Sequence, residues 1–340
     1  MKPKVIVELL KETVEEWQKD KASNLAAALA YYTIFSLAPL IIIAIAIAGA
    51  IFGEEAARGE IVGQIQGLVG TDGAKVIETA IENANQPNTG SIASLISVVV
   101  LLFGASGVFA QLQDALNTIW EVQPKPGRAI KGFVRKRVLS FSIVLGIGFL
   151  LLVSLIISAA LSAVNSYTQD LLPGADVLWW FVNWVISFGI ITLLFALMYK
   201  FLPDVKISWN DVWIGAIITA LLFTLGKFVL GMYLGKGSFG STYGAAGSLV
   251  IVLAWVYYAA QILFFGAEFT QVYARRFGSQ IVPDDHALPL TDEARANQGR
   301  PHNHNLKAVS ANGERSSNPG AALLRFYQRL ARRSGLDNRH

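Results

Sequence analysis

The sequence predicts an all-α, polytopic membrane protein with six transmembrane helices and with both termini in the cytoplasm. The first observation is composition: the 340-residue chain is 53% hydrophobic and only 15% charged, whereas a soluble domain carries about 25% charged residues. Its mean hydropathy is +0.46. The second observation is that Lys and Arg gather in a few connecting segments, as the positive-inside rule requires of cytoplasmic loops.

Six apolar stretches are long enough to cross a hydrocarbon core of about 30 Å as helices. They define a transmembrane domain at 25–276, with spans at about 25–52, 92–116, 138–163, 177–200, 210–234 and 248–273. The first stretch contains Pro39, which bends a helix because its ring removes the hydrogen bond to the carbonyl of Phe35. The hydroxyl of Ser36 is placed to help satisfy the freed backbone.

The segments outside the spans carry patterns of their own. Residues 1–24 predict an amphipathic helix, which suits either a membrane surface or a solvated arm packed on the bundle. Its apolar side consists of Ile6, Leu10, Val14 and Trp17. Residues 54–90 predict a helical hairpin over the outer end of the bundle, because two apolar stripes flank a break at residues 71–73.

Residues 277–340 predict a cytoplasmic tail that is mostly disordered, because they are rich in Pro, Asp, Asn, Ser, Arg and His. The exception is a basic amphipathic helix at about 319–334, which begins after a capping Asn318 and carries four Arg around an apolar side. Such a helix suits an anionic membrane surface or a partner, and a merely solvated tail is the competing interpretation.

The distribution of positive charge predicts the orientation. With the N-terminus inside, the cytoplasmic segments near the spans hold 15 Lys and Arg, and the outer segments hold three. The strongest signal is the connection between the second and third spans, which sets six basic residues against Glu121: Lys125, Arg128, Lys131, Arg135, Lys136 and Arg137. That connection and the tail therefore belong inside, and residues 54–90 belong outside.

Polar side chains follow one face of the last span, where Tyr257, Gln261, Glu268 and Gln271 fall within an arc of about 80°. A carboxyl at membrane depth is costly and usually faces the bundle interior or a wet cavity. With polar groups of the first two spans, this face predicts a cavity open to the cytoplasm, lined by Tyr31, Tyr32, Ser36, Gln111, Asp114, Tyr257, Gln261 and Glu268. Two alternatives stay open: Asp114 lies at the membrane interface, and Glu268 is a shallow carboxyl paired with an Arg.

An opposing gate is expected in the outer half, formed by Asn183, Lys227, Phe239 and Tyr243. Lys227 alternatively snorkels toward the interface. The glycines of 235–240 match the dinucleotide fingerprint G-x-G-x-x-G, but that fingerprint needs a preceding strand and an acid about 20 residues later. Here an apolar span precedes it, so we interpret the segment as the turn between the last two spans.

Several chemistries are not expected. The chain has no cysteine and four His, all outside the spans, and the pair His302 and His304 has no acidic or thiol neighbours to complete a metal site. No nucleophile with an adjacent base can be named. We therefore predict no catalytic residues, no metal, no cofactor and no enzymatic activity, and the topology explains the basic charge without nucleic acid.

Four segments together resemble the YihY/BrkB family of bacterial inner-membrane proteins. They are AAALAYYTIFSLAPL, LFGASGVFAQLQDALNTIWEV, KFLPDVKISWNDVWIGA and the stretch from Tyr243 to Ala274. The resemblance covers about residues 10–276 and leaves the tail outside. It implies a six-span all-α bundle in the bacterial inner membrane with a transport-type role. Members have also carried the label ribonuclease BN. This sequence does not support that label, because it contains no His-x-His-x-Asp-His metal cluster.

Two classes of function follow. The first is a transporter or flippase-like protein that moves a small solute or an amphiphile through the bundle, driven by a gradient or passively. The alternative is a non-transporting scaffold that organises partners through its N-terminal arm and basic tail. A membrane-embedded hydrolase is a distant third. The expected partners are the lipid bilayer, anionic lipids at the basic tail and an unknown solute or lipid, whereas the sequence sets no oligomeric state.

Overall fold

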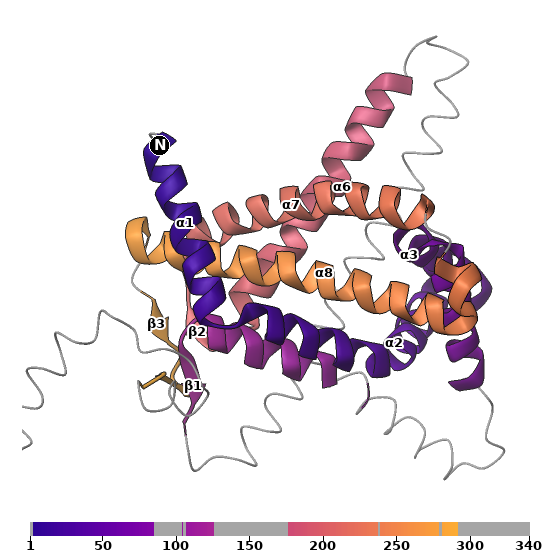
Figure 1. The fold of residues 1–340 in the computed structure, drawn as a ribbon, viewed down its shortest axis with the longest axis horizontal. Coiled ribbons are helices and arrows are strands. Elements are labelled where there is room, and N and C mark those ends of the chain that lie inside the picture. The colour runs from indigo at the N-terminus through magenta and orange to yellow at the C-terminus, as the bar shows by residue number, and fades with distance from the viewer. Residues whose placement is uncertain are drawn as a thin grey trace, which may run out of the picture. The chain divides into compact units, whose positions relative to one another are not determined.

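The structure is a computed structural model that describes residues 3–84, 104, 107–125, 176–236, 239–278 and 281–291. The chain divides into two compact units, Met1–Pro289 and Leu290–His340, and the first contains nearly all described residues (Figure 1). Four stretches of its helices are long and apolar enough to cross a membrane: Ala22–Ala50, Phe181–Phe201, Trp209–Leu230 and Leu249–Phe277. They coincide with the first, fourth, fifth and sixth predicted spans. The predicted spans 92–116 and 138–163 lie largely or wholly outside the described residues.

The N-terminal arm is a separate helix, α1 (Pro3–Lys19), followed by α2 (Ala22–Phe52). The turn between them places Lys21 in the left-handed region, with φ 53°. The helix itself is as predicted, but the side that it buries against the bundle is formed by Leu9, Thr13 and Glu16. Of the predicted apolar side, Ile6, Leu10 and Val14 are exposed, and only Trp17 is half-buried against the main core. The arm packs through the line Leu9, Thr13 and Glu16, which lies beside the predicted apolar side. Glu16 can be part of this contact because Arg275 of α8 supplies its countercharge.

In α2, Pro39 is accommodated inside one continuous helix, and Ser36 has a different role from the predicted one. Its hydroxyl donates to the carbonyl of Gly104, 2.6 Å away on the neighbouring helix, which includes residues 107–119. A Cβ at Gly104 would lie 3.1 Å from the Pro39 ring, and one at Gly107 would lie 3.5 Å from Ser36 Oγ. The two glycines therefore let this helix approach α2 closely.

Helix α3 (Glu54–Ala84) is interrupted at Gly70, whose φ of 78° ends one helical segment and starts another. The Arg58 guanidinium lies 2.7 Å from Glu82 and 3.6 Å from Glu78, across the break. The two segments therefore fold back on each other, as the predicted hairpin requires. The break falls one residue before the predicted one, and residues 85–90 of that prediction lie outside the described residues.

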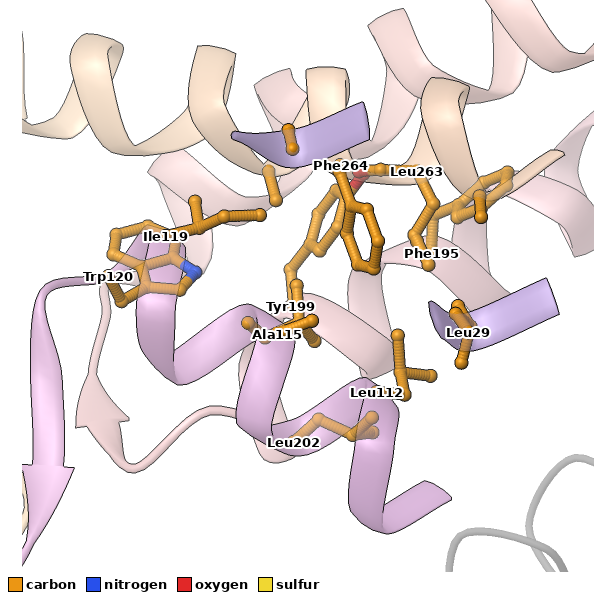
Figure 2. Close-up of a cluster of buried hydrophobic side chains, with 14 of the residues drawn as sticks. Leu29, Leu112, Ala115, Ile119, Trp120, Phe195, Tyr199, Leu202, Leu263 and Phe264 are labelled. Atoms are coloured by element: carbon orange, nitrogen blue, oxygen red, sulfur yellow. The ribbon is translucent and has the colours of Figure 1, made fainter. Parts of the chain in front are cut away.

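The main core joins α2, the helix at 107–119, α6 (Asp176–Phe201), α7 (Trp209–Lys236) and α8 (Phe239–Phe277). Figure 2 shows Tyr199 beside Phe264 in the middle of this cluster, with Trp120 and Leu29 toward its opposite sides. The Tyr199 hydroxyl lies 2.9 Å from Thr219 Oγ1 and donates to the carbonyl of Leu263 at 2.8 Å. One buried phenol from α6 thus bonds both α7 and α8.

Two short antiparallel ribbons modify the all-α prediction. Strand β1 (Val122–Pro124) pairs with β4 (Ala287–Pro289), and β2 (Val205–Lys206) pairs with β3 (Val282–Pro283). Strands of two or three residues have no readable periodicity, so the prediction of a mostly disordered tail from residue 277 missed them. We call the end of the bundle formed by residues 121–125, 202–208 and 275–289 the ribbon end. The predicted helix at 319–334 lies outside the described residues.

Candidate functional site

The candidate site centres on Glu268, which has no exposed surface and lies within the stretch Leu249–Phe277 of α8. It is followed by about 13 Å of helix before α8 ends at Phe277. Neither carboxylate oxygen has a hydrogen-bond partner among the described residues. Because an unpaired buried carboxylate is among the most costly groups in a protein interior, Glu268 requires an explanation beyond packing.

Three further acids surround this carboxyl. Asp20, Glu16 and Glu121 interact electrostatically with Glu268, and Arg275 is the cation that acts on it. The Arg275 guanidinium, however, donates to Glu12 at 2.6 Å and to Glu16 at 3.2 Å. The alternative for Glu268 required an Arg partner, but Arg275 bonds to α1. The Glu268 carboxyl has no hydrogen-bond partner in the part of the chain that the structure describes.

Other polar groups near this part of the core also lack partners. The indole N–H groups of Trp17 and Trp120 are buried and bonded to no described residue, and the side-chain oxygen of Gln271, one turn beyond Glu268, is in the same state. Both indoles pack with the cluster that contains Phe264 and Ala267, which are on the same helix as Glu268. A proton or a cation can satisfy the unpartnered oxygens of Glu268 and Gln271, whereas the two indole N–H groups need an acceptor.

The structure places the other predicted cavity residues in different environments. Ser36 is buried against Gly104, and Gln261 and Gln111 are half-buried, the Gln261 oxygen lacking a partner among described residues. Tyr31, Tyr32, Asp114 and Tyr257 are exposed. The charged groups that act on Glu268 are Glu16, Asp20, Glu121 and Arg275, and convergence of Gln111 with Glu268 stays a prediction.

The predicted gate residues lie on α6, α7 and the start of α8. Asn183 and Lys227 are exposed on their helices. Phe239 and Tyr243 belong to the first turns of α8, and their side chains lie outside the described part. Their joint role as a gate therefore stays a prediction.

One polar cluster was not predicted. Asp204, 8% exposed at the ribbon end, accepts hydrogen bonds from the side-chain amides of Gln113 at 3.3 Å and Asn117 at 2.9 Å, and its own backbone N–H donates to Asn117 Oδ1 at 2.7 Å. Gln113 and Asn117 are one turn apart on a buried face, a spacing that was readable in the sequence. Their partner, 87 residues away from Asn117, was not.

A cavity of about 270 Å³ lies at the opposite end, between α2 and the α3 hairpin. Its lining is mixed: Ile42, Ile45 and Ile81 contribute apolar surface, and Glu54 and Arg58 contribute charged groups. This position differs from the predicted cytoplasmic cavity. Within the described ranges, no group of three His, Asp or Glu side chains is arranged to hold a metal ion.

Comparison with known proteins gives a consistent assignment. A family model described as virulence factor BrkB matches residues 13–290. The match continues beyond the predicted limit of 276 and includes β3 and β4, so the expectation that everything after Phe277 lies outside the family was wrong. No solved structure matches the chain.

The similar proteins are bacterial. A UPF0761 membrane protein of Psychrobacter sp. strain PRwf-1 is 27% identical over 81% of this chain, which spans only 50% of that relative. One of Pseudoalteromonas translucida strain TAC 125 is 28% identical over 74% of this chain and 81% of its own length. The putative ribonuclease-like protein YfkH of Bacillus subtilis strain 168 is 19% identical over 78% of this chain and 95% of its own length. Because the family model covers most of the sequence and four helices are apolar and long enough to span a bilayer, the chain is a multi-pass membrane protein of the BrkB family.

Proposed function

We propose that this protein is a transporter or flippase-like protein that moves a small solute or an amphiphile, and that Glu268 binds and releases a proton or a cation during the cycle. One observation carries the proposal: Glu268 is fully buried in a membrane-spanning helix, and neither oxygen has a hydrogen-bond partner among the described residues. Ionisable residues inside membranes are costly and are typically found on ion and substrate pathways.

A purely structural role accounts poorly for this arrangement. A carboxyl retained for packing normally keeps its countercharge, because breaking a buried pair costs about 3–5 kcal/mol. Here Arg275 donates its hydrogen bonds to Glu12 and Glu16. A proton or cation on Glu268 would remove the cost of the unpaired charge, and release of that ligand would be coupled to exposure of the site.

The proposal is transport and not catalysis, because a buried carboxyl can carry a proton whereas hydrolysis needs a nucleophile with a base. It includes a cavity that opens to the cytoplasm near Glu268, residence in the bacterial inner membrane, and binding of anionic lipids by the basic tail. A scaffold that organises partners is the competing function.

The test is Glu268→Gln, which keeps the shape of the side chain and removes its charge. Purified protein is reconstituted in vesicles and assayed for flipping of fluorescent phosphatidylethanolamine and for solute-induced currents between pH 5 and 8. We expect the variant to assemble normally and to lose activity or its pH dependence. Glu55→Gln, at an exposed carboxyl of α3, is the matched control and should behave as wild type.

A readout without a substrate separates the outcomes. Infrared difference spectra recorded on a pH change should contain a carboxyl band that is absent from Glu268→Gln and present in Glu55→Gln. Full, pH-dependent activity of Glu268→Gln would remove the coupling role. If no probe moves with wild-type protein and no such band appears, the scaffold is the better function.

A further inference from the structure

The exposed side of α1 is strongly apolar for a helix that flanks a membrane domain. Ile6, Val7, Leu10 and Val14 are 45%, 66%, 40% and 41% exposed, respectively. At 100° per residue, Ile6, Leu10 and Val14 lie within about 80° of one another, to one side of the line by which α1 contacts the bundle. We call these four residues the α1 stripe.

The contact line fixes the depth of α1. Leu9 is buried in a cluster with Phe269 and Val272 of α8, and Val5 packs there with Ile214 and Ile218 of α7. Ile214 and Ile218 belong to the stretch Trp209–Leu230 and lie about 8–14 Å along α7 from its first residue. Since α1 packs on side chains that are themselves inside a spanning stretch, it lies at the level of the bilayer surface and below.

Ion pairs fix the rotation of α1. Its acidic flank carries Glu8 and Glu12, and both pair with Arg276. Nη1 of Arg276 lies 3.5 Å from Oε2 of Glu8, and its Nε lies 2.8 Å from Oε2 of Glu12. Glu12 also bonds Arg275. These arginines occupy the last turn of α8, the water-facing end of its spanning stretch. The acidic flank therefore faces water, and the α1 stripe, on the other flank, points back toward the body of the spanning helices.

The neighbouring surface of the bundle continues the α1 stripe. On α7, Trp213 is 38% exposed and Ile217 and Leu221 are both 48% exposed. Ile217 adjoins Ile214 and Ile218, which pack against the same cluster as Val5 of α1. Figure 1 shows α1 crossing α8 obliquely near the C-terminal end of α8. The geometry is that of a helix lying in the membrane plane with one flank immersed.

From these contacts we infer that α1 is an interfacial helix whose stripe contacts phospholipid acyl chains at the headgroup boundary, in the leaflet at the ribbon end. The exposed polar flank mixes Lys4 and Lys11 with Glu8 and Glu15, so the attraction comes from apolar burial and not from net charge. Neutral and anionic lipid surfaces should hold α1 equally well. The inference is independent of whether the protein transports anything.

The chain lacks cysteine, so single nitroxide labels can be attached at chosen positions of the full-length protein. Labels at Ile6→Cys, Leu10→Cys and Val14→Cys report the α1 stripe, and labels at Lys4→Cys, Lys11→Cys and Glu15→Cys report the polar flank of the same helix. Leu225→Cys, 57% exposed on α7, is the lipid-facing reference. Power saturation in phosphatidylcholine vesicles, with and without phosphatidylglycerol, compares collisions with oxygen and with a water-soluble nickel chelate.

We expect the oxygen-to-nickel collision ratio to be severalfold higher at the α1 stripe than on the polar flank, and to be the same in both lipid mixtures. Equal, high nickel accessibility on both flanks would show a solvated arm and overturn the inference. Low accessibility to both reagents at the α1 stripe would show that protein, such as a second copy, covers it, and would overturn the inference as well. Normal elution of each labelled variant excludes misfolding as the cause.

Discussion

Asn117 and Asp204 form a buried polar pair that holds the connection between α6 and α7. Asp204 accepts from the Asn117 side chain and donates its backbone N–H back to it, and both residues are nearly buried. The backbone carbonyl of Asp204 also accepts a hydrogen bond from the backbone N–H of Asp284 at 2.9 Å. A single acidic residue thus joins three segments that are distant in sequence.

Replacing Asn117 by Ala should leave the carboxylate of Asp204 and its backbone N–H with one partner fewer each. Removing a partner from a buried polar group costs about 1–3 kcal/mol, so we expect a lower thermal unfolding midpoint in detergent. Asn183→Ala, at an exposed position of α6, is the matched control and should change the midpoint little. Equal midpoints for the two variants would contradict a stabilising role of the pair.

Lys206 and Asp285 form an exposed ion pair beside the ribbons, with Nζ donating to Oδ1 at 2.8 Å. This hydrogen bond raises the pKa of Lys206 and lowers the pKa of Asp285. The Asp285 contribution is therefore present above its unfolded pKa of about 4 and is lost as pH falls through the lowered folded value. The Lys206 contribution is lost as pH rises through its raised value, so the pair acts between these limits.

We expect a nitroxide at Leu288→Cys, on β4, to become more mobile as the solution is acidified below about pH 4, the ordinary pKa of Asp. Adding Asp285→Asn should flatten this part of the profile, because the titrating carboxylate is gone. The change is expected to be small and weaker at high salt, since the pair is exposed. A profile that Asp285→Asn leaves unchanged would assign the mobility to another group.

At the scale of elements, α7 and α8 approach each other through small residues. A methyl group at Gly266 would overlap Thr219 of α7 and the Tyr199 hydroxyl of α6, and one at Gly215 would overlap Thr270. Interfaces of this kind let helix backbones come close in a membrane, where association depends on packing. The same glycine that allows the contact also leaves room for the Tyr199 hydrogen bonds.

Gly266→Ala should therefore destabilise the bundle, although Ala is the better helix former by about 1 kcal/mol. Overpacking of this kind costs about 1–3 kcal/mol, so the net effect should be a lower unfolding midpoint. Gly189→Ala on α6, where an added Cβ meets nothing within 4 Å, should keep or raise the midpoint. The two substitutions are chemically identical, and a fall in both would indicate that helix packing at Gly266 is not the cause.

Hydropathy and periodicity predicted the apolar helices and the break in α3, because each of these signals is local. The buried side of α1 was not predictable from α1, since it includes Glu16, which bonds Arg275, 259 residues away. Strand pairing between Val122 and Pro289 and the Asn117 to Asp204 bond are equally non-local. At Glu268 the sequence identified the residue, and only the fold shows which groups surround it.

At the scale of the whole molecule, the ribbon end constrains the topology. Residues 122–124, 205–206 and 282–289 pair with one another, so these three connections lie on one side of the membrane. The stretch Phe181–Phe201 of α6 leads into the ribbon end, so its start at Phe181 lies on the opposite side of the membrane. We therefore predict an odd number of crossings between residues 125 and 181, and we expect the apolar stretch 138–163 to supply one.

Six spans with the ribbon end inside can be tested by accessibility labelling, since the cysteine-free chain accepts one cysteine at a time. Lys131→Cys lies in the most basic connection and should react with a membrane-impermeant maleimide only after cells are opened, because basic loops stay in the cytoplasm. Lys75→Cys, exposed on α3, should react in intact cells. Labelling of Lys131→Cys from outside would reverse the orientation, and labelling of both sites from one side would require an even number of crossings between them and exclude the six-span order.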